Sequence, residues 1–587
     1  MERKMEDRVM ELMTQLESIH LHRPSDLHHS TSSKTQNTNS FSENLLQDYG
    51  SERCSKSLRS SFVEDSYPSN GLTTTCNQEG WEMRWTAGYG RYLITSRNIT
   101  AGEVIFREKP LLLVPKVASD PLCLACLKTL DHKGCRCSTC GILLCSPDCP
   151  GGSHGAQECC LLSRLGLKSA PLNGRDVKEL HALVGPLRAL LLATESSAAR
   201  EALSLLQSHK EKRMKLPIGR FVEDRIVKTL RSRLGLKVES EIIHHLCGVL
   251  DTNAFEVTLE NGGRARAISV LASFLNHSCL PNAQRWYTQG HMTVRASVDI
   301  LKGSPILINY TQTLWGTIAR ATHLSSCKMF TCQCKRCLDP MELGSHMSSV
   351  ACRECQEMMT PPETPRRPWL CPNCGTSTDG SAIEALVRAG AVALGRLTSD
   401  DLQGMTSSLT HFSRMLGQNH YIVAQVKYAL VQAIMKRPLK DVNFTDLAQV
   451  VDLTKELLKL AACIEPGLTR FRGLLLYDQT RAEAEVIDRC SSSRGDTNPE
   501  VRDSSLKDIT ASNPTETSTN PLQTLLYQAA ECEYILQYDP LLQEVMELTR
   551  QLRWRMESDG SVMTSNATPG SNPGRHCGAS KSHSSLE

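Results

Sequence analysis

Cysteines in short, regular spacings are the residues of this chain that point most directly to chemistry. The 587-residue sequence holds 25 cysteines, of which nine lie between Cys123 and Cys160 and eight between Cys327 and Cys374. Clusters of C-x2-C pairs are typical of zinc sites in a reducing compartment, whereas a secreted protein would use its cysteines in disulfides. The sequence therefore predicts zinc in both clusters. Seven isolated cysteines fit no ligand spacing, and we expect ordinary thiols there: Cys54, Cys76, Cys247, Cys463, Cys490, Cys532 and Cys577.

The first cluster offers enough ligands for two tetrahedral Zn²⁺ ions. Its candidates are seven cysteines and one histidine: Cys123, Cys126, Cys137, Cys140, Cys145, Cys149, His154 and Cys159. Cys135 and Cys160 are spare thiols that could substitute for one of them.

The second cluster contains two different patterns. Cys332, Cys334 and Cys337 form a C-x-C-x2-C run, which supplies three thiolates and leaves the fourth corner of a tetrahedral site open. After them come two C-x2-C pairs with fifteen residues between, the spacing of a zinc ribbon: Cys352, Cys355, Cys371 and Cys374.

A polar stretch from Ser273 to Asn282 is the other candidate for chemistry. It reads S-F-L-N-H-S-C-L-P-N, and its polar residues Asn276, His277, Ser278 and Asn282 follow the apolar residues Ile268, Val270, Leu271 and Phe274. Burying the amides and the imidazole of such a stretch without partners would be costly, so plain core is a poor interpretation. A polar turn between two strands is the alternative to a binding site.

The motif N-H-S-C-x-P-N in this stretch resembles the signature of SET-domain lysine methyltransferases. The cysteine blocks on either side resemble those of the SET-MYND (SMYD) family, and the ribbon pairs together with the wording Leu314 to Thr317 resemble its divergent, arthropod-type branch. The resemblance implies an α+β fold: a SET β-fold with a knot-like cofactor loop, an inserted MYND zinc finger and helical insert, a post-SET zinc loop with a zinc ribbon, and a C-terminal α-helical superhelix.

The same resemblance implies how the ligands are shared among four zinc ions. In the finger the pairs would interleave, so that Cys123, Cys126, Cys145 and Cys149 hold one ion and Cys137, Cys140, His154 and Cys159 the other. Cys279 would leave the polar stretch to complete the site of Cys332, Cys334 and Cys337. One departure is that the family carries His-x3-Cys, whereas four residues separate His154 from Cys159.

For activity, the resemblance implies an S-adenosylmethionine-dependent protein-lysine N-methyltransferase with a histone or non-histone substrate and a role in transcription. Tyr310 would be the catalytic residue, since a phenol can orient a neutral lysine amine in a narrow, desolvated channel. The cofactor-binding residues carried over by position are Gly88, Tyr89, Gly90, Asn253, Ser273, Asn276, His277, Tyr310 and Phe330.

Two departures favour a second hypothesis. The turn before Tyr310 reads Gly303-Ser304-Pro305 where relatives carry acidic residues, and Lys328 stands where many carry a tyrosine. The chain could therefore be a weakly active or inactive scaffold that recruits partners through the finger and the C-terminal helices.

Apolar periodicity predicts the elements that position these residues. An amphipathic helix is expected over Met5 to Ile19, then a flexible linker; short strands at Tyr92, Val104 and Leu111; strands at His291 and Pro305; and helices from Ile383 to Cys490 and from Leu522 to Leu552. The resulting segments are 1–80, N-terminal; 81–122, first part of SET; 123–160, finger; 161–262, helical insert; 263–325, core SET; 326–376, post-SET loop and ribbon; 377–556, helical domain with a loop at 491–521; and 557–587, a disordered tail.

Composition narrows the function classes. The net charge is +3, from 66 basic and 63 acidic residues, which argues against nucleic-acid binding by the whole molecule. No apolar run long enough for a membrane helix and no secretory signal is evident, so we expect an intracellular protein of the nucleus, the cytoplasm or both. The expected partners are a substrate lysine and proline-rich peptides at the finger, with the chain a monomer. The sequence does not name the substrate.

Overall fold

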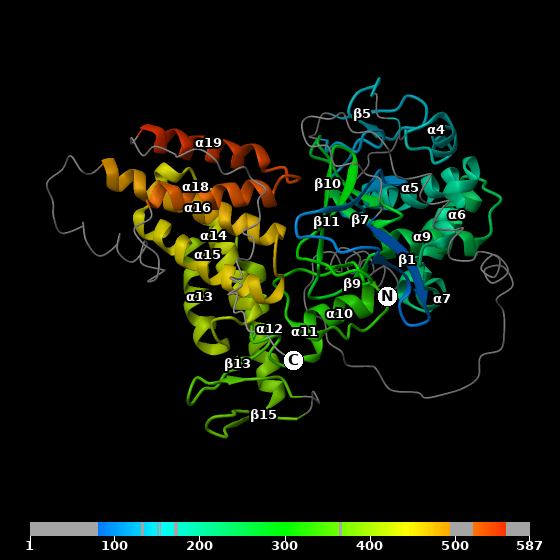
Figure 1. The fold of residues 1–587 in the computed structure, drawn as a ribbon. Coiled ribbons are helices and arrows are strands. Elements are labelled where there is room, and N and C mark those ends of the chain that lie inside the picture. The colour runs from blue at the N-terminus through cyan, green and yellow to red at the C-terminus, as the bar shows by residue number, and fades with distance from the viewer. Residues whose placement is uncertain are drawn as a thin grey trace, which may run out of the picture.

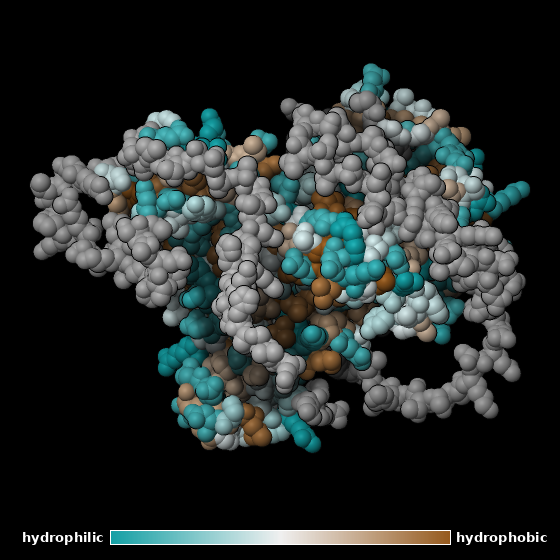
Figure 2. All heavy atoms as spheres, viewed as in Figure 1, coloured by the Kyte–Doolittle hydropathy of each residue, from teal (hydrophilic) through white to brown (hydrophobic). Residues whose placement is uncertain are grey.

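The computed structural model describes residues 80–130, 134–149, 152, 154–168, 174–362, 367–398, 400–492 and 520–558. The helix expected at residues 5–19, the linker after it, most of the loop at 491–521 and the tail lie outside these residues. The described part has a β-rich half, which carries the finger and the helical insert, and a half built of stacked helices (Figure 1). Hydrophilic residues dominate the visible outer surface, and hydrophobic ones show mainly between the two halves (Figure 2).

Small sheets build the β-rich half. β1 (Trp81–Thr86) pairs antiparallel with β2 (Gly90–Thr95), and β3 (Val104–Glu108) joins β10 (Ala283–Thr288) and β11 (His291–Ala296). β4 (Leu112–Pro115), β8 (Arg264–Ile268) and β7 (Phe255–Thr258) form a third sheet. The apolar runs that predicted strands at Tyr92, Val104 and Leu111 are β2, β3 and β4, which pack around one buried core.

The polar stretch and the strand before Tyr310 lie side by side. β9 (Asn276–His277) pairs in parallel with β12 (Leu307–Ile308). Asn282 strengthens this junction, because its Oδ1 accepts from the Leu307 N–H at 2.8 Å and its Nδ2 donates to the Pro305 carbonyl at 2.9 Å. The expected strand from Pro305 to Tyr310 is shorter than predicted, since Asn309 bonds the Thr311 N–H and turns the chain after Ile308.

The finger and the insert share a second core. In the finger, β5 (Cys135–Arg136) pairs with β6 (Leu143–Leu144), and α4 (Ala156–Ser163) follows. The insert comprises α5 (Gly174–Glu195), α6 (Ser197–Leu205), α7 (Lys210–Met214), α8 (Pro217–Phe221), the π-helices η1 (Val222–Val227) and η2 (Thr229–Arg233), and α9 (Ser240–Asn253). The apolar spacing that is irregular in the sequence after Val227 coincides with this π-helical stretch.

Beyond Tyr310 come α10 (Thr317–Cys327), α11 (Lys335–Leu338) and two small hairpins. The hairpins are β13 (Val350–Ala351) with β14 (Met358–Met359) and β15 (Trp369–Leu370) with β16 (Ser377–Thr378). They belong to the two C-x2-C pairs and lie at one end of the helical half (Figure 1).

The helical half comprises α12 (Gly380–Arg396), α13 (Leu402–Leu416), α14 (Tyr421–Met435), α15 (Phe444–Ile464), α16 (Arg470–Ser492), α18 (Pro521–Ile535) and α19 (Leu542–Ser558). Asp379, Asp401, Asn443 and Asn520 cap four of these helices through their side chains. The helices predicted from Ile383 onward are therefore present. No helix among the described residues is long and apolar enough to cross a membrane.

Direct bonds join the two halves. The Glu465 carboxylate accepts from Gln284 at 2.6 Å and from Thr313. The Arg295 guanidinium is fully buried, donates to the Tyr534 carbonyl at 2.9 Å and lies over the Tyr534 ring.

Candidate functional site

A cavity of about 4690 Å³ opens within the β-rich half, between its strands and the helical insert. Its lining comes from the β1–β2 turn, the end of α9, the polar stretch, the segment around Tyr310 and the segment from Ser325 to Cys334. Every residue carried over as cofactor-binding contributes to this lining, namely Gly88, Tyr89, Gly90, Asn253, Ser273, Asn276, His277, Tyr310 and Phe330. Segments far apart in the sequence therefore meet at one place.

The β1–β2 turn leaves open space at the cavity. A Cβ at Gly88 or Gly90 would meet no atom within 4 Å, and Gly90 has a φ of 66°, in the left-handed region that favours glycine. The Asn276 side chain donates to the Tyr89 carbonyl at 3.5 Å, which links the turn to β9. The turn can accept a ligand against its backbone.

His277 fixes the backbone at Tyr310. The Tyr310 N–H donates to Nδ1 of His277 at 3.0 Å, and Nε2 of His277 lies 3.1 Å from the Cys279 sulfur. Burial lowers the pKa of His277 to about 4, so the ring is neutral and this network assigns its proton to Nε2. Both ring nitrogens of His277 therefore have partners within the protein. A ligand at this place would contact the backbone of His277 or the face of its ring.

The Tyr310 hydroxyl donates to the carbonyl of Leu275, one residue before the Asn-His pair. Burial raises the pKa of Tyr310 above its ordinary value. The group is therefore a neutral phenol at physiological pH and can orient a polar partner, but it is a poor base.

The cavity is also lined by Asn253, Ser273 and Phe330, which differ in how far other residues already bond their side chains. The Asn253 amide donates to the carbonyls of Gln207 at 2.8 Å and Val249 at 2.9 Å, so its carbonyl oxygen is the group left for a ligand. Ser273 donates to the Ser269 carbonyl at 2.7 Å. The Phe330 ring is 37% exposed and lies 6.0 Å from the His277 ring, centroid to centroid.

Glu108 supports the backbone just before the polar stretch, a role that was not predicted from the sequence. Its buried carboxylate accepts from the backbone N–H groups of Leu271 at 3.1 Å and Ala272 at 2.7 Å. Burial raises the pKa of Glu108 to about 7. An acidic residue at the end of an apolar strand, as here in β3, is the one signal that could have drawn attention to it.

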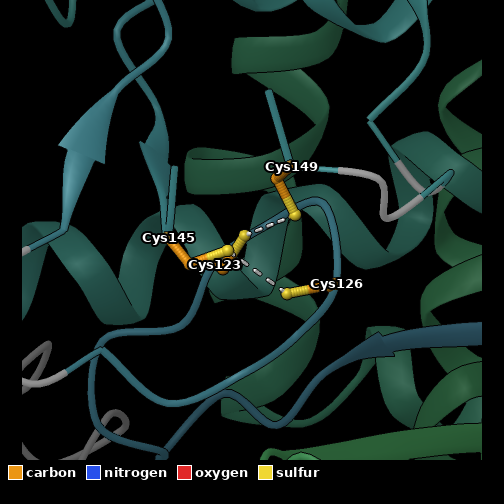
Figure 3. A group of neighbouring side chains, drawn as sticks. All are labelled: Cys123, Cys126, Cys145 and Cys149. Carbon is orange, nitrogen blue, oxygen red and sulfur yellow. Dashed lines mark hydrogen bonds between the residues drawn. The ribbon is translucent and has the colours of Figure 1, made fainter. Parts of the chain in front are cut away.

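The sixteen predicted metal ligands come together in four groups of four, with the ligand atoms of each group within 4.8 Å of one another. The first two are Cys123, Cys126, Cys145 and Cys149, and Cys137, Cys140, His154 and Cys159. The others are Cys279, Cys332, Cys334 and Cys337, and Cys352, Cys355, Cys371 and Cys374. Figure 3 shows the first group, whose sulfurs converge from separate segments.

Sulfur separations test whether these groups fit zinc. Zn–S bonds of about 2.3 Å in a tetrahedron require sulfurs roughly 3.8 Å apart. Cys123 and Cys149 are 3.7 Å apart, Cys137 and Cys159 3.6 Å, Cys279 and Cys332 4.0 Å, and Cys352 and Cys374 3.6 Å. All four groups are compatible with tetrahedral zinc.

The second group has a supporting carboxylate that the sequence analysis missed. Nδ1 of His154 lies 3.0 Å from Glu158, and Nε2 lies 3.5 Å from the Cys140 sulfur. Arg188 from α5 donates to both oxygens of Glu158, at 2.6 and 3.0 Å. This arrangement orients the imidazole as a ligand. The spacing His-x3-Glu at the start of α4 is the signal that could have found it.

A buried ionic network surrounds the third group. Arg320 of α10 donates to the Cys279 sulfur at 3.2 Å and to Glu342 at 2.8 Å, and Arg336 donates to the same carboxylate at 2.9 Å. All three side chains are at most 1% exposed. The network holds the sulfur of Cys279, the ligand that the polar stretch contributes to the third group. Sequence spacing gave no hint of it, because the three residues come from separate segments.

Two cations flank Tyr310. The Lys328 amine lies 5.5 Å from the centre of the Tyr310 ring and donates to the Thr252 carbonyl at 2.5 Å. Burial lowers the pKa of Lys328 to about 8, and burial also lowers that of Arg285 to about 10. The position where an aromatic wall was missing from the sequence therefore holds an amine.

The model of the SET domain family matches residues 90–311 of the chain. The SET domain-containing protein SmydA-8, isoform A, of Drosophila melanogaster is 30% identical over 309 residues, which cover 51% of this chain and 65% of that relative. The chain contains a SET domain and is similar to SET-MYND proteins of the arthropod type. The match spans just under two thirds of the length of SmydA-8.

One further relative in sequence and one solved structure are also similar to this chain. The protein-lysine N-methyltransferase SMYD4 of Mus musculus is 30% identical over 140 residues, 22% of this chain and 17% of that protein. A crystal structure of the SET domain of LSMT bound to lysine and AdoHcy aligns with 88% of this chain and 96% of its own at 13% identity, with a TM-score of 0.24. That score is too low to support an inference about this chain.

Proposed function

We propose that this chain is an S-adenosylmethionine-dependent protein-lysine N-methyltransferase. The observation that carries the proposal is the convergence of all nine expected cofactor residues on one cavity, with Tyr310 bonded through its backbone to His277. SMYD4, a relative in sequence, is named as a protein-lysine N-methyltransferase. The open glycine turn and the lining amides of Asn253 and Asn276 fit a polar cofactor.

S-adenosylmethionine, when bound, would supply a methyl group on a sulfonium, which a neutral amine must approach in line. The chain's residues act by orientation and exclusion of water. Asn276 holds the glycine turn against β9. The Tyr310 hydroxyl, fixed beside the Leu275 carbonyl, would orient the acceptor amine as a neutral phenol. No proton transfer to Tyr310 is required of it.

We further propose that each of the four cysteine groups binds one Zn²⁺. The third would tie the segment after Tyr310 to the polar stretch, because Cys279 belongs to one and Cys332, Cys334 and Cys337 to the other. Such a metal would stabilise one wall of the cavity by folding energy that the apo chain lacks.

The second candidate is a scaffold of low activity that recruits partners through the finger and helices. Lys328 favours it, because an ammonium at this place repels a protonated lysine and replaces an aromatic wall.

The test is methyl transfer from labelled S-adenosylmethionine to a cell extract. Wild-type protein should label at least one protein band, and Tyr310→Phe should not. Tyr527→Phe is the matched control, because Tyr527 is 68% exposed on α18. Labelling that persists equally in Tyr310→Phe contradicts the proposed site, and no labelling by wild type favours the scaffold.

A further inference from the structure

The cavity near Tyr310 holds a cation that forms no ion pair with a carboxylate of the described residues. Arg285 of β10 has its guanidinium 4.6 Å from the centre of the Phe255 ring, and no ion pair of Arg285 is found among the described residues. The neighbouring carboxylate of Glu256 is already bonded to Lys116 at 2.6 Å and lies 3.4 Å from Arg264. Arg285 thus lines the cavity without a carboxylate in ion-pair contact among the described residues.

Lys328 is a second such cation. Its amine is bonded to the Thr252 carbonyl, a neutral acceptor. The nearby carboxylate of Asp251 is taken by two arginines, Arg213 and Arg266, the latter at 3.0 Å. Burial, together with the nearby positive charge of Arg285, lowers the pKa of Lys328, and the Lys328 amine lies 5.5 Å from the centre of the Tyr310 ring.

The rest of the cavity lining is also positively charged on balance. Along its described lining, basic side chains outnumber acidic ones, and several of the acidic ones are paired, such as Glu241 with Lys210 at 2.8 Å. A protonated lysine entering such a site would be repelled unless its own segment brought negative charge.

We propose that the acceptor side of this cavity selects a protein segment that carries carboxylates beside the target lysine. The inference rests on the proposed function and names its substrate class. Carboxylates from the segment would pair with Arg285 and Lys328, which have no carboxylate partner among the described residues, and a guanidinium and an ammonium are both suited to that pairing. A basic segment would leave these charges opposed and would bind poorly.

Fluorescence anisotropy of labelled peptides tests this directly with the full chain. Three peptides share one central lysine, which is flanked by glutamates, by glutamines or by lysines. We expect the glutamate peptide to bind about tenfold more tightly than the glutamine peptide and the lysine peptide to bind most weakly. Equal affinity of the glutamate and glutamine peptides overturns the inference.

Charge-removing variants locate the effect. Arg285→Gln and Lys328→Met should each reduce the preference for glutamate several-fold, whereas the charge-conserving Arg285→Lys and Lys328→Arg should retain most of it and show that the site tolerates substitution. Arg388→Gln on α12 and Lys459→Met on α15, both exposed and outside the cavity, should leave the preference unchanged. A preference that survives both charge-removing variants contradicts the assignment.

Calorimetry with S-adenosylmethionine separates this inference from the proposed function. If Arg285→Gln weakens cofactor binding and leaves peptide binding unchanged, the cations serve the cofactor carboxylate and the inference is wrong. If wild type binds no cofactor but still prefers the glutamate peptide, the proposed function fails and the acidic-segment site stands. If wild type binds cofactor and shows no preference for the glutamate peptide, the inference fails and the proposed function stands.

Discussion

The backbone N–H of Tyr310 donates to Nδ1 of His277 at 3.0 Å, and the other nitrogen of the same ring lies 3.1 Å from the sulfur of Cys279. One imidazole therefore connects the proposed catalytic residue to a thiol of the third cysteine group. A displacement of Cys279 would therefore act on the Tyr310 backbone through His277.

Tyr310→Phe should lower methyl-transfer turnover by on the order of a hundredfold or more, because the preorganised hydroxyl is lost while the ring remains. Cofactor affinity should change little. Asn276→Ala should instead weaken cofactor binding, since the amide that joins β9 to the glycine turn is removed from the ground state as well. Steady-state kinetics and calorimetry on both variants measure the contrast. An established turnover that Tyr310→Phe leaves intact would place the acceptor channel elsewhere.

Cys279→Ser and Cys352→Ser should have the same effect on zinc content but different effects on cofactor binding. Both should lose one zinc of four by metal analysis after dialysis. Only Cys279→Ser should also abolish cofactor binding, because its group adjoins His277, whereas Cys352 belongs to a hairpin outside the cavity lining. Equal effects on cofactor binding would refute the shared role of the third group, and a wild-type content of two zinc ions or fewer would refute the count.

Glu342→Ala should destabilise the protein by about 3 to 5 kcal/mol, because it leaves two buried arginines without their carboxylate. Denaturant unfolding followed by fluorescence measures the change. Glu384→Ala, at an exposed position on α12, is the control and should alter the free energy of unfolding by less than about 0.5 kcal/mol. A Glu342→Ala protein as stable as this control would show that the network contributes little.

Lys328 should make stability depend on alkaline pH. Burial lowers its pKa to about 8 from the ordinary 10.5, so between these values the unfolded chain holds a proton that the folded chain has released. Stability supplied by this group therefore rises with pH through that window. Lys328→Met should be more stable than wild type near pH 7, and the difference should shrink toward pH 10. Lys459→Met, at an exposed position, should show no such trend; an identical trend would argue against a depressed pKa at Lys328.

Features that depend on a local sequence pattern could be predicted. Spacing alone identified the ligand-rich clusters, and apolar periodicity identified β2, β3, β4 and the helices from α12 onward. Periodicity did not predict that the strand is limited to Leu307–Ile308, because the Asn309 turn that ends the strand competes with the apolar run.

Supporting residues were not predictable in the same way. Glu108 acts on a segment far away in the chain, and only its place at the end of an apolar strand sets it apart. Nothing in the neighbourhood of Arg320 or Glu342 distinguishes them from ordinary charged residues. The position of the Lys328 amine over Tyr310 likewise depends on how α10 ends against α9. Such contacts are products of the tertiary fold, which no periodicity encodes.

Isothermal titration of the zinc-loaded chain with S-adenosylmethionine tests the central claim most directly. The proposed function predicts saturable binding of one cofactor per chain, weakened in Asn276→Ala and retained in the control Tyr527→Phe. Absence of binding by the folded wild-type chain at millimolar cofactor would contradict the assignment of the cavity as a methyl-donor site.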